Sequence, residues 1–531
     1  MSPTNTSRHF DRWTIGTLVC VTLWMVWAAG HYTVFDDEAF SCQRYVLPMG
    51  EMISALWDGV EPDPPLYYVL QNLSVRVAGV GPLGLRALSI VMFLAGLVAM
   101  RATGQAWFDR RTGLVTMLLC ALHPAHLFFG FAARWYSTMF LMVALLLWVT
   151  RLLADVQPTT PALHRRERRL ILLWALASAA VCYTNYFGPV VVGLVWLVSI
   201  ARHSCKKRWL GAGLIAAALF TPWLPPFWRQ ATAFPQFGGS PSSMLATAAR
   251  TTMALLAGDL ASPRAWWVWG PMLVLCVLLL VRAWQERSRV WPIGAIVVGC
   301  FLAGTLSRTM IDKYVMTFSG IACMGVAALL TASCRAGHAP MRLAACTTLT
   351  LAWSACGFNL VRETNWSSLR WLDPFPTAVS DTMDTGVPLR QWAVTHPSGR
   401  YYAAMENVKR HNLWSSHDAF SSLALVPPLH RCKCDDYVRT PGLLPSVIAK
   451  KTPTSLVTLE ASGFADSTDW EELRSWLQKD YQVTDEKRYQ LDPDADWKDR
   501  IDPKYGHPRW RITVRLWERR LAVTQPSDDQ R

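Results

Sequence analysis

Long apolar stretches recur through the first two-thirds of the chain, and they restrict its fold more than any other feature. The first runs from Trp13 to Gly30, and others follow at short intervals as far as Val361. An α-helix needs roughly 20 apolar residues to cross the hydrocarbon core of a bilayer. The chain has 531 residues, of which 52% are hydrophobic and only 17% charged, so it is too apolar for an ordinary soluble enzyme. The sequence predicts a polytopic membrane protein.

Together with the first stretch, the later apolar windows predict an all-α membrane bundle of about 11 transmembrane helices. These windows are Leu83–Met100, Gly113–Phe131, Ser137–Leu153, Leu170–Tyr186, Phe187–Ile200, Leu210–Trp228, Ala265–Val281, Val290–Leu306, Tyr314–Thr331 and Met341–Val361. Between the first two spans, Arg44–Trp57 has an apolar side, which predicts a helix lying in the interface plane. Leu66–Val80 is short for a span, so we expect an interfacial or re-entrant helix. If it spans instead, every later segment is inverted.

Basic residues gather in short loops between the apolar windows, which explains the net charge of +14. The clusters at 165–169 and 202–208 are examples, and such loops stay on the cytoplasmic side. We therefore interpret the basic charge as setting orientation and expect no nucleic-acid partner. This places the N-terminus in the cytoplasm and the first loop, residues 31–82, outside.

Beyond Arg362 the chain becomes polar, and no stretch is long enough to span. Ser455–Glu460 and Trp510–Trp517 alternate as strands do, and Asp469–Tyr481 is typical of an amphipathic helix. We expect a membrane domain over residues 1–361 and a soluble extracytoplasmic α/β domain over residues 362–531.

The 13 cysteines give no metal site. Cys42, Cys432 and Cys434 would lie outside the cytoplasm, where a disulfide can persist. Cys432 and Cys434 are too close together for zinc-finger spacing, and no second pair accompanies them. We expect no cofactor, although a divalent cation beside the acids of the first loop is conceivable.

Three consecutive acids, Asp36, Asp37 and Glu38, directly follow the first apolar segment. Adjacent ionised carboxylates repel one another, and a simple loop cap needs only one. One of them near the interface can act as a general base toward an acceptor hydroxyl. A solvated acidic loop without chemistry is the alternative, and these residues alone leave both open.

Three cations fall at the same predicted external edge: Arg86, Arg134 and Lys313. A single cation at a span end often only extends its charge to the interface. Three that converge on one face with an acidic loop favour an anion, and arginine and lysine suit phosphate. A sugar on a lipid phosphate could then react without a general acid. The transition state would resemble an oxocarbenium ion, as in glycoside hydrolysis, and the anomeric centre would be inverted.

Short motifs occur in a fixed order. They are Asp-Asp-Glu-Ala-Phe-Ser at 36–41, Asp-Pro-Pro-Leu-Tyr-Tyr at 63–68, Leu-Arg-Ala-Leu-Ser at 85–89, Ala-Arg-Trp-Tyr at 133–136, Tyr-Thr-Asn-Tyr at 183–186 and Lys-Tyr at 313–314. Over roughly residues 13–330 this set resembles the bacterial GT-C glycosyltransferases. It is similar to the branch related to protein O-mannosyltransferases, lipopolysaccharide-core galacturonosyltransferases and the lipid A aminoarabinose transferase.

The resemblance implies an integral protein of a bacterial inner or plasma membrane, polyprenyl-phosphate sugar donors and a catalytic base in the first external loop. Asp37 matches the base, and Glu38 completes the catalytic pair. The positions implied to bind substrate are Asp36, Asp63, Tyr67, Arg86, Arg134, Tyr136, Asn185, Lys313 and Tyr314. Three of these depart from the family pattern, since Asp63 replaces His or Lys, Asn185 replaces His, and Lys313 replaces Arg.

The sequence thus predicts an inverting membrane glycosyltransferase that uses a polyprenyl-phosphate sugar and a lipid, glycan or protein acceptor. A transporter or flippase of lipid-linked sugar is the alternative. Against it, the hydropathy shows no inverted repeat and no pair of broken spans with charges at the membrane centre. For His123 and His126, at a span end, we expect interfacial hydrogen bonding rather than metal ligation.

Overall fold

The computed structural model describes residues 3–31, 38, 41, 44–45, 47–59, 63–79, 82–157, 159–233, 244–257, 266–307, 312–335, 347–354, 400–401, 455–462, 475, 477–490 and 511–519. The chain divides into two units. The first comprises Met1–Tyr32 and Leu47–Leu372, and the second comprises Thr33–Val46 and Asp373–Arg531. The domain boundary at residue 361 stays a prediction.

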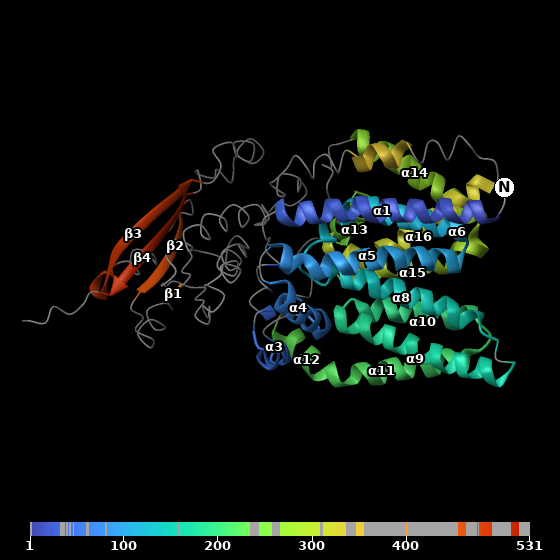
Figure 1. Cartoon of the computed structure of the whole chain (residues 1–531), viewed down its shortest axis with the longest axis horizontal. Coiled ribbons are helices and arrows are strands. Elements are labelled where there is room, and N and C mark those ends of the chain that lie inside the picture. Colours follow the sequence, from blue (N-terminus) through green and yellow to red (C-terminus); the bar gives the residue numbers. More distant parts are fainter. Residues whose placement is uncertain are drawn as a thin grey trace, which may run out of the picture. The chain divides into compact units, whose positions relative to one another are not determined.

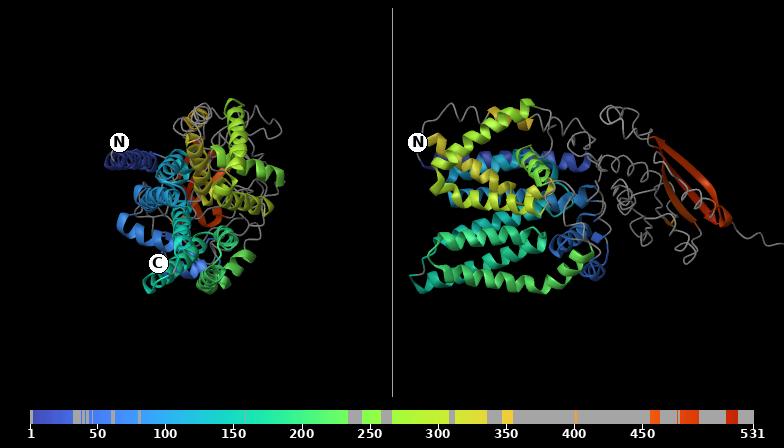
Figure 2. Two further views of the ribbon diagram at one scale, coloured as in Figure 1. Left: turned by 90° about the vertical axis from the view of Figure 1, so that its right-hand side faces the viewer. Right: turned by 180° about the vertical axis from the view of Figure 1, so that it is seen from behind.

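The first unit is a bundle of helices, most of which lie side by side along one direction (Figures 1 and 2). Its helices are α1 Pro3–His31, α3 Met49–Trp57, α4 Pro65–Ala78, α5 Pro82–Trp107, α6 Arg110–Leu122, α7 Pro124–Phe129, α8 Tyr136–Asp155, α9 Pro161–Thr184, α10 Gly188–Arg202, α11 Lys206–Phe220, η1 Thr221–Trp223, α12 Leu224–Ala233, α13 Met244–Ala257, α14 Trp266–Gln285, α15 Arg287–Leu306, η3 Asp312–Thr317 and α16 Ser319–Arg335. The short helices α3, α4 and α12 lie at one end of the bundle, and the N-terminus lies at the other (Figure 1).

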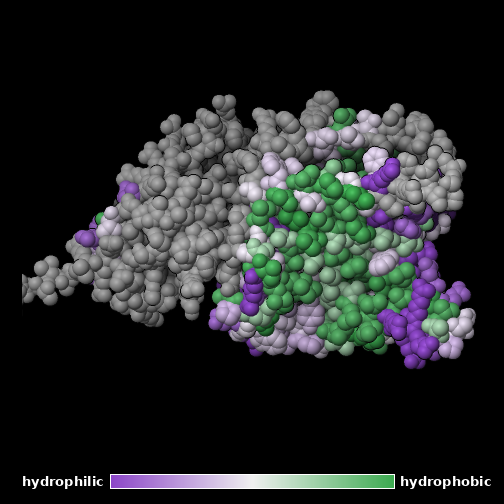
Figure 3. Space-filling view, viewed as in Figure 1, coloured by the Kyte–Doolittle hydropathy of each residue, from purple (hydrophilic) through white to green (hydrophobic). Residues whose placement is uncertain are grey.

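Apolar residues cover much of the face of this bundle that Figure 3 shows. Within the described residues, 5 segments are long and apolar enough to cross a membrane: Arg12–Gly30, Leu83–Trp107, Tyr136–Asp155, Lys206–Ala231 and Arg287–Leu306. Shorter apolar helices are Gly188–Arg202, Gly270–Gln285 and Ser319–Ser333. The chain is a multi-pass membrane protein with a mostly helical fold. The number of about 11 spans stays a prediction.

Prolines set several helix boundaries that hydropathy alone placed differently. The predicted interfacial helix from Arg44 is interrupted, because Leu47 and Pro48 are not helical and α3 begins at Met49. A residue that precedes proline is sterically kept out of the helical region. The same effect divides the predicted window Gly113–Phe131 into α6 and α7 at Pro124.

Two further helices bear on the predicted membrane topology. Helix α4 has 14 residues, so it is about 21 Å long and shorter than the hydrocarbon core. It ends at Gly79, whose φ of 82° is accessible to glycine. Helix α13 was not predicted, because its 14 residues are too few for a span and Arg250 interrupts its apolar residues.

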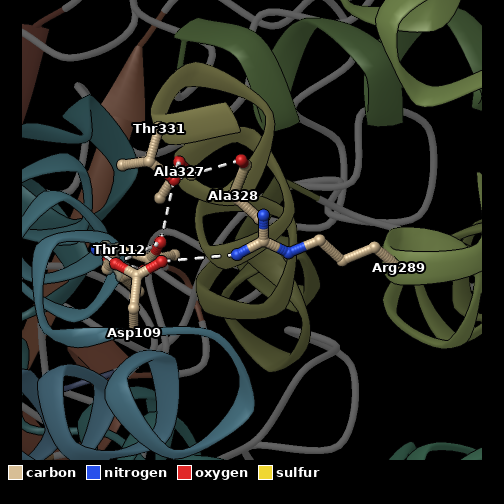
Figure 4. A network of polar contacts seen from close by, with 7 residues as sticks. Asp109, Thr112, Arg289, Ala327, Ala328 and Thr331 are labelled. Atoms are coloured by element: carbon tan, nitrogen blue, oxygen red, sulfur yellow. Dashed lines mark hydrogen bonds and ion pairs between the residues drawn. The ribbon is translucent and has the colours of Figure 1, made fainter. Parts of the chain in front are cut away.

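A polar network ties three helices together near the start of α6 (Figure 4). Asp109 precedes α6, and its carboxylate accepts a hydrogen bond from the backbone N–H of Thr112 at 2.9 Å. Its second oxygen lies 3.3 Å from Nη2 of Arg289 in α15. The hydroxyls of Thr112 and Thr331 are 2.8 Å apart, which adds α16. One helix cap therefore also fixes the contacts of α6 with α15 and α16.

In the second unit, the described strands form one sheet in the order β1-β2-β4-β3. They are β1 Arg400–Tyr401, β2 Ser455–Ser462, β3 Tyr481–Gln490 and β4 Arg511–Arg519. Strand β4 pairs antiparallel with both β2 and β3. The strands predicted near β2 and β4 are confirmed. Strand β3 was missed. The predicted helix Asp469–Tyr481 is confirmed at residues 475 and 477–480, which are helical, and is wrong only at Tyr481, where β3 begins. The α/β class stays a prediction.

Candidate functional site

The segments that carry the predicted site residues of the first unit are neighbours in space. Helix α4 packs against α5 and α9, and η3 packs against α7 and α8. Asp63 precedes α4, and Arg134 lies in the turn before α8. Asn185 ends α9. Residues far apart in the sequence thus converge on one region of the bundle.

Asp63 and Arg134 form a buried ion pair at the centre of this region. Nη2 of Arg134 lies 2.8 Å from Oδ2 of Asp63, and each side chain is only 7% exposed. Nη1 of the same guanidinium donates to the hydroxyl of Tyr68 at 3.3 Å. Because both charges lie out of water, each depends strongly on the other. Asp63 is more than an acid at a helix start, since it compensates the arginine that the sequence assigned to the phosphate.

Tyr186 occupies the turn between α9 and α10 and joins a second set of polar contacts. Its hydroxyl donates to the side-chain oxygen of Gln230, and Nε1 of Trp223 donates to that hydroxyl at 3.0 Å. Nε2 of Gln230 donates to the backbone oxygen of Leu56 at 2.7 Å. Burial raises the pKa of Tyr186, the Trp223 hydrogen bond lowers it, and the charge of Asp63 raises it.

Sequence reasoning missed several members of these two networks. Tyr68 and Tyr186 lie inside two of the sequence motifs, so their place in those motifs could have identified them as site residues. Gln230 and Trp223 could not be identified from the sequence, because a single glutamine or tryptophan near the end of an apolar window is common.

Arg86 and Tyr67 are both buried and both take part in helix packing. Nη1 of Arg86 donates to the backbone oxygen of Ala29 at 2.8 Å, which satisfies a carbonyl in the last turn of α1. Its guanidinium also lies 5.2 Å from the ring centre of Phe131. The hydroxyl of Tyr67 lies 3.2 Å from Oγ of Ser89 in α5. These contacts hold α1, α4 and α5 together beside the Asp63–Arg134 pair.

Aromatic contacts bring η3 to the start of α8. The rings of Trp135 and Tyr314 are 5.5 Å apart. Tyr136 begins α8, and its buried ring meets Phe129 edge-on at 5.1 Å. Lys313 belongs to η3, but its side chain lies outside the described residues. The predicted Lys-Tyr motif thus lies beside the Ala-Arg-Trp-Tyr motif.

Asn185 has a local structural role. Its side-chain oxygen accepts a hydrogen bond from the backbone N–H of Phe187 at 2.9 Å, and the residue ends α9. Asparagine favours such turns because its short side chain reaches the backbone two residues on. The departure from histidine at this position therefore has a direct explanation in the turn geometry.

The predicted catalytic acids belong to the second unit. Asp36 and Asp37 lie outside the described residues. Glu38 is fully buried and helical. The roles of all three stay predictions.

Both histidines of the α6–α7 break form hydrogen bonds, as predicted. Nδ1 of His126 lies 2.7 Å from the backbone oxygen of Cys120, and its Nε2 lies 2.7 Å from Oγ of Ser319. A carbonyl only accepts, so Nδ1 carries the proton and Nε2 accepts from the serine. Nε2 of His123 lies 2.7 Å from the backbone oxygen of Leu255. These bonds connect α6 and α7 to α13 and α16.

No protein-family model matches the chain, and no curated protein matches it by sequence. Solved structures do share its fold. ArnT from Cupriavidus metallidurans in the apo state superposes with a TM-score of 0.58 at 12% identity, over 95% of this chain and 98% of that one. The GT-C fold is confirmed. The ArnT structure bound to undecaprenyl phosphate gives a TM-score of 0.53 at 12% identity, over the same shares of 95% and 98%.

The arabinofuranosyltransferase AftD from Mycobacteria gives a TM-score of 0.50 at 14% identity. This alignment covers 96% of the present chain but only 40% of AftD. At these identities the likeness concerns the fold. It extends over nearly the whole length of this chain, well past the motif region of residues 13–330.

Proposed function

We propose that this chain is an integral-membrane glycosyltransferase that takes its sugar from a polyprenyl-phosphate donor. The observation that carries the proposal is the fold shared with ArnT over 95% of this chain. That neighbour was solved bound to undecaprenyl phosphate. The second support is chemical, because this chain has acids and cations at the sequence positions that such a reaction needs.

In the proposed reaction, the carboxylate of Asp37 takes the proton of an acceptor hydroxyl. The acceptor oxygen forms a bond to the anomeric carbon on the face opposite the phosphate. The bond from that carbon to the phosphate oxygen breaks, and polyprenyl phosphate leaves. The anomeric centre is therefore inverted. Glu38 is the second acid of the catalytic pair.

The leaving phosphate needs cations rather than a general acid or a metal. Lys313, Arg134 and Arg86 are the proposed sources of positive charge. Asp63 already compensates Arg134 across 2.8 Å, so Lys313 carries the larger share of this task. Tyr68 and Asp63 fix the orientation of the Arg134 guanidinium, which favours an arranged site over a mobile one.

The proposed acceptor is a lipid, glycan or protein on the extracytoplasmic side, and the N-terminus is cytoplasmic. Short loops rich in Arg and Lys support this orientation. The donor can be found in the host cell by mass spectrometry. Cells that lack the chain should accumulate its lipid-linked sugar and lose the corresponding exported glycan.

The test uses the full chain in membranes, supplied with the labelled donor identified in that way. Asp37→Asn should lower sugar transfer by about 100-fold or more, which is typical for loss of a general base. Asp155→Asn is the matched control, because this acid is 53% exposed and lies outside the proposed substrate-binding residues, and it should retain most of the transfer. Full activity of Asp37→Asn, or an equal loss in both variants, would remove the assignment of the base to Asp37. Transport of the labelled lipid across proteoliposomes without any sugar transfer would support the flippase alternative instead.

A further inference from the structure

Exposed cations form two groups at the end of the bundle where α9 and α11 begin. Those on α9 are Arg165, Arg166, Arg168 and Arg169, and those on α11 are Lys206 and Lys207. Hydrophilic residues gather at this end of the bundle, next to the apolar surface (Figure 3).

On α9, the cations continue an apolar stripe that faces away from the bundle. Arg165, Arg169, Leu172 and Leu176 follow one another at helical spacing, so they share one side of the helix. Leu172 is 51% exposed and Leu176 is 47% exposed. The opposite side is packed, because Trp174 is buried and its Nε1 donates to Thr150 of α8 at 2.9 Å.

Helix α11 repeats the arrangement. Lys206, Leu210 and Leu214 follow at intervals of four residues, with Lys207 beside them, so the lysines also continue an exposed apolar stripe. Leu210 is 45% exposed and Leu214 is 71% exposed. Trp209 lies on another side of the helix and is fully buried.

The acids of this region are paired with other arginines, Arg208 and Arg151. Glu167 lies 2.6 Å from Nε of Arg208, and Nη1 of Arg208 donates to the backbone oxygen of Leu153 at 2.7 Å. Asp155 pairs with Arg151 at 2.8 Å. In the part of the chain that the structure describes, none of the six exposed cations forms an ion pair. Their charge is therefore directed outward.

The spacing of the arginines along α9 matches the thickness of a lipid headgroup layer. Arg165 and Arg169 are about 6 Å apart along the helix axis, and Leu172 follows about 4.5 Å further on. A headgroup layer is about 5–7 Å thick on each side of the hydrocarbon core. If the leucines contact acyl chains, these arginines lie among the phosphates of the same leaflet.

We propose that this surface binds anionic phospholipids, with the leucines of α9 and α11 against the acyl chains and the six cations against the headgroups. A soluble anion would use only the charges, whereas a phospholipid matches the apolar stripe and the cations together. The surface is distinct from the proposed catalytic region, and the inference does not depend on the glycosyltransferase proposal.

The experiment uses the purified full chain in a neutral detergent. Phosphatidylglycerol or phosphatidylcholine is added, and the lipid retained per protein is measured by mass spectrometry. The wild-type chain should retain phosphatidylglycerol in preference to phosphatidylcholine. Arg165→Gln with Arg169→Gln should reduce that preference by about 25-fold, because each cation near an anionic headgroup contributes about fivefold.

The matched control, Arg76→Gln with Arg111→Gln, removes the same charge from exposed positions outside the two stripes and should retain the preference. A charge-preserving variant, Arg165→Lys with Arg169→Lys, should do so too, which separates loss of charge from loss of fold. Equal retention of both lipids by the wild type would overturn the proposal. So would an unchanged preference in the double glutamine variant, or displacement of phosphatidylglycerol by inorganic phosphate.

Discussion

The Asp63–Arg134 pair offers the most direct test of how this site is built. Asp63→Asn leaves the guanidinium buried opposite a neutral amide, and Arg134→Met leaves a buried carboxylate. Each side chain is 7% exposed, so water replaces the lost partner poorly. Breaking one partner of a buried pair costs about 3–5 kcal/mol, whereas removing both is far less damaging. The double variant should therefore be more stable than the sum of the two single changes predicts.

The magnitude can be read from thermal unfolding of the purified chain, followed by tryptophan fluorescence. For a unit of roughly 360 residues, with an unfolding entropy of ~2.1 cal/mol/K per residue, a loss of 3–5 kcal/mol lowers the midpoint by about 4–7 °C. Each single variant should show this shift. The double variant should recover at least about half of the summed loss, as coupled neighbours do.

The exposed pair of Asp58 and Arg229 is the matched control. Its atoms are 3.6 Å apart, and the two side chains are 60% and 54% exposed. Asp58→Asn should lower the midpoint by no more than about 1 °C, because exposed pairs contribute little. If Asp63→Asn is as mild as this control, or if the two buried changes simply add, burial does not make the charges of Asp63 and Arg134 depend on each other.

Two other expectations concern helix packing. Gly113→Ala places a methyl group about 2.5 Å from the backbone oxygen of Arg101 and should destabilise the α5–α6 contact. The methyl group of Gly211→Ala meets nothing within 4 Å, so this variant should be neutral or stabilising. Thermal unfolding of both variants checks this, and equal midpoints would contradict it. His126→Leu leaves the Ser319 hydroxyl without its acceptor at 2.7 Å. In the same measurement this should lower the free energy of unfolding by about 1–3 kcal/mol, more than Ser319→Ala does. A His126→Leu variant as stable as wild type would show that this buried hydrogen bond contributes nothing to stability.

Much of this fold could be predicted because hydropathy is a local property. A stretch such as Ser137–Leu153 is apolar at every turn, so it leaves water whatever surrounds it, and α8 runs from Tyr136 to Asp155. The alternation of apolar and polar residues likewise predicted strands close to β2 and β4. The helix α13 was not predicted because its 14 residues are too few for a span, and its position depends on contacts with α15, η3 and α7.

The candidate site, like the fold, could be predicted from the sequence only in part. The sequence by itself determined which residues could carry the chemistry, because acids, arginines and tyrosines stand out in an apolar chain, and it placed Arg134 and Tyr314 in recognisable motifs. Only the tertiary structure decided what they contact. It paired Arg134 with Asp63, 71 residues away, and used Asn185 to form a turn. Ion pairs across such separations depend on how α4 and the turn before α8 pack, and no local pattern in the sequence records that packing.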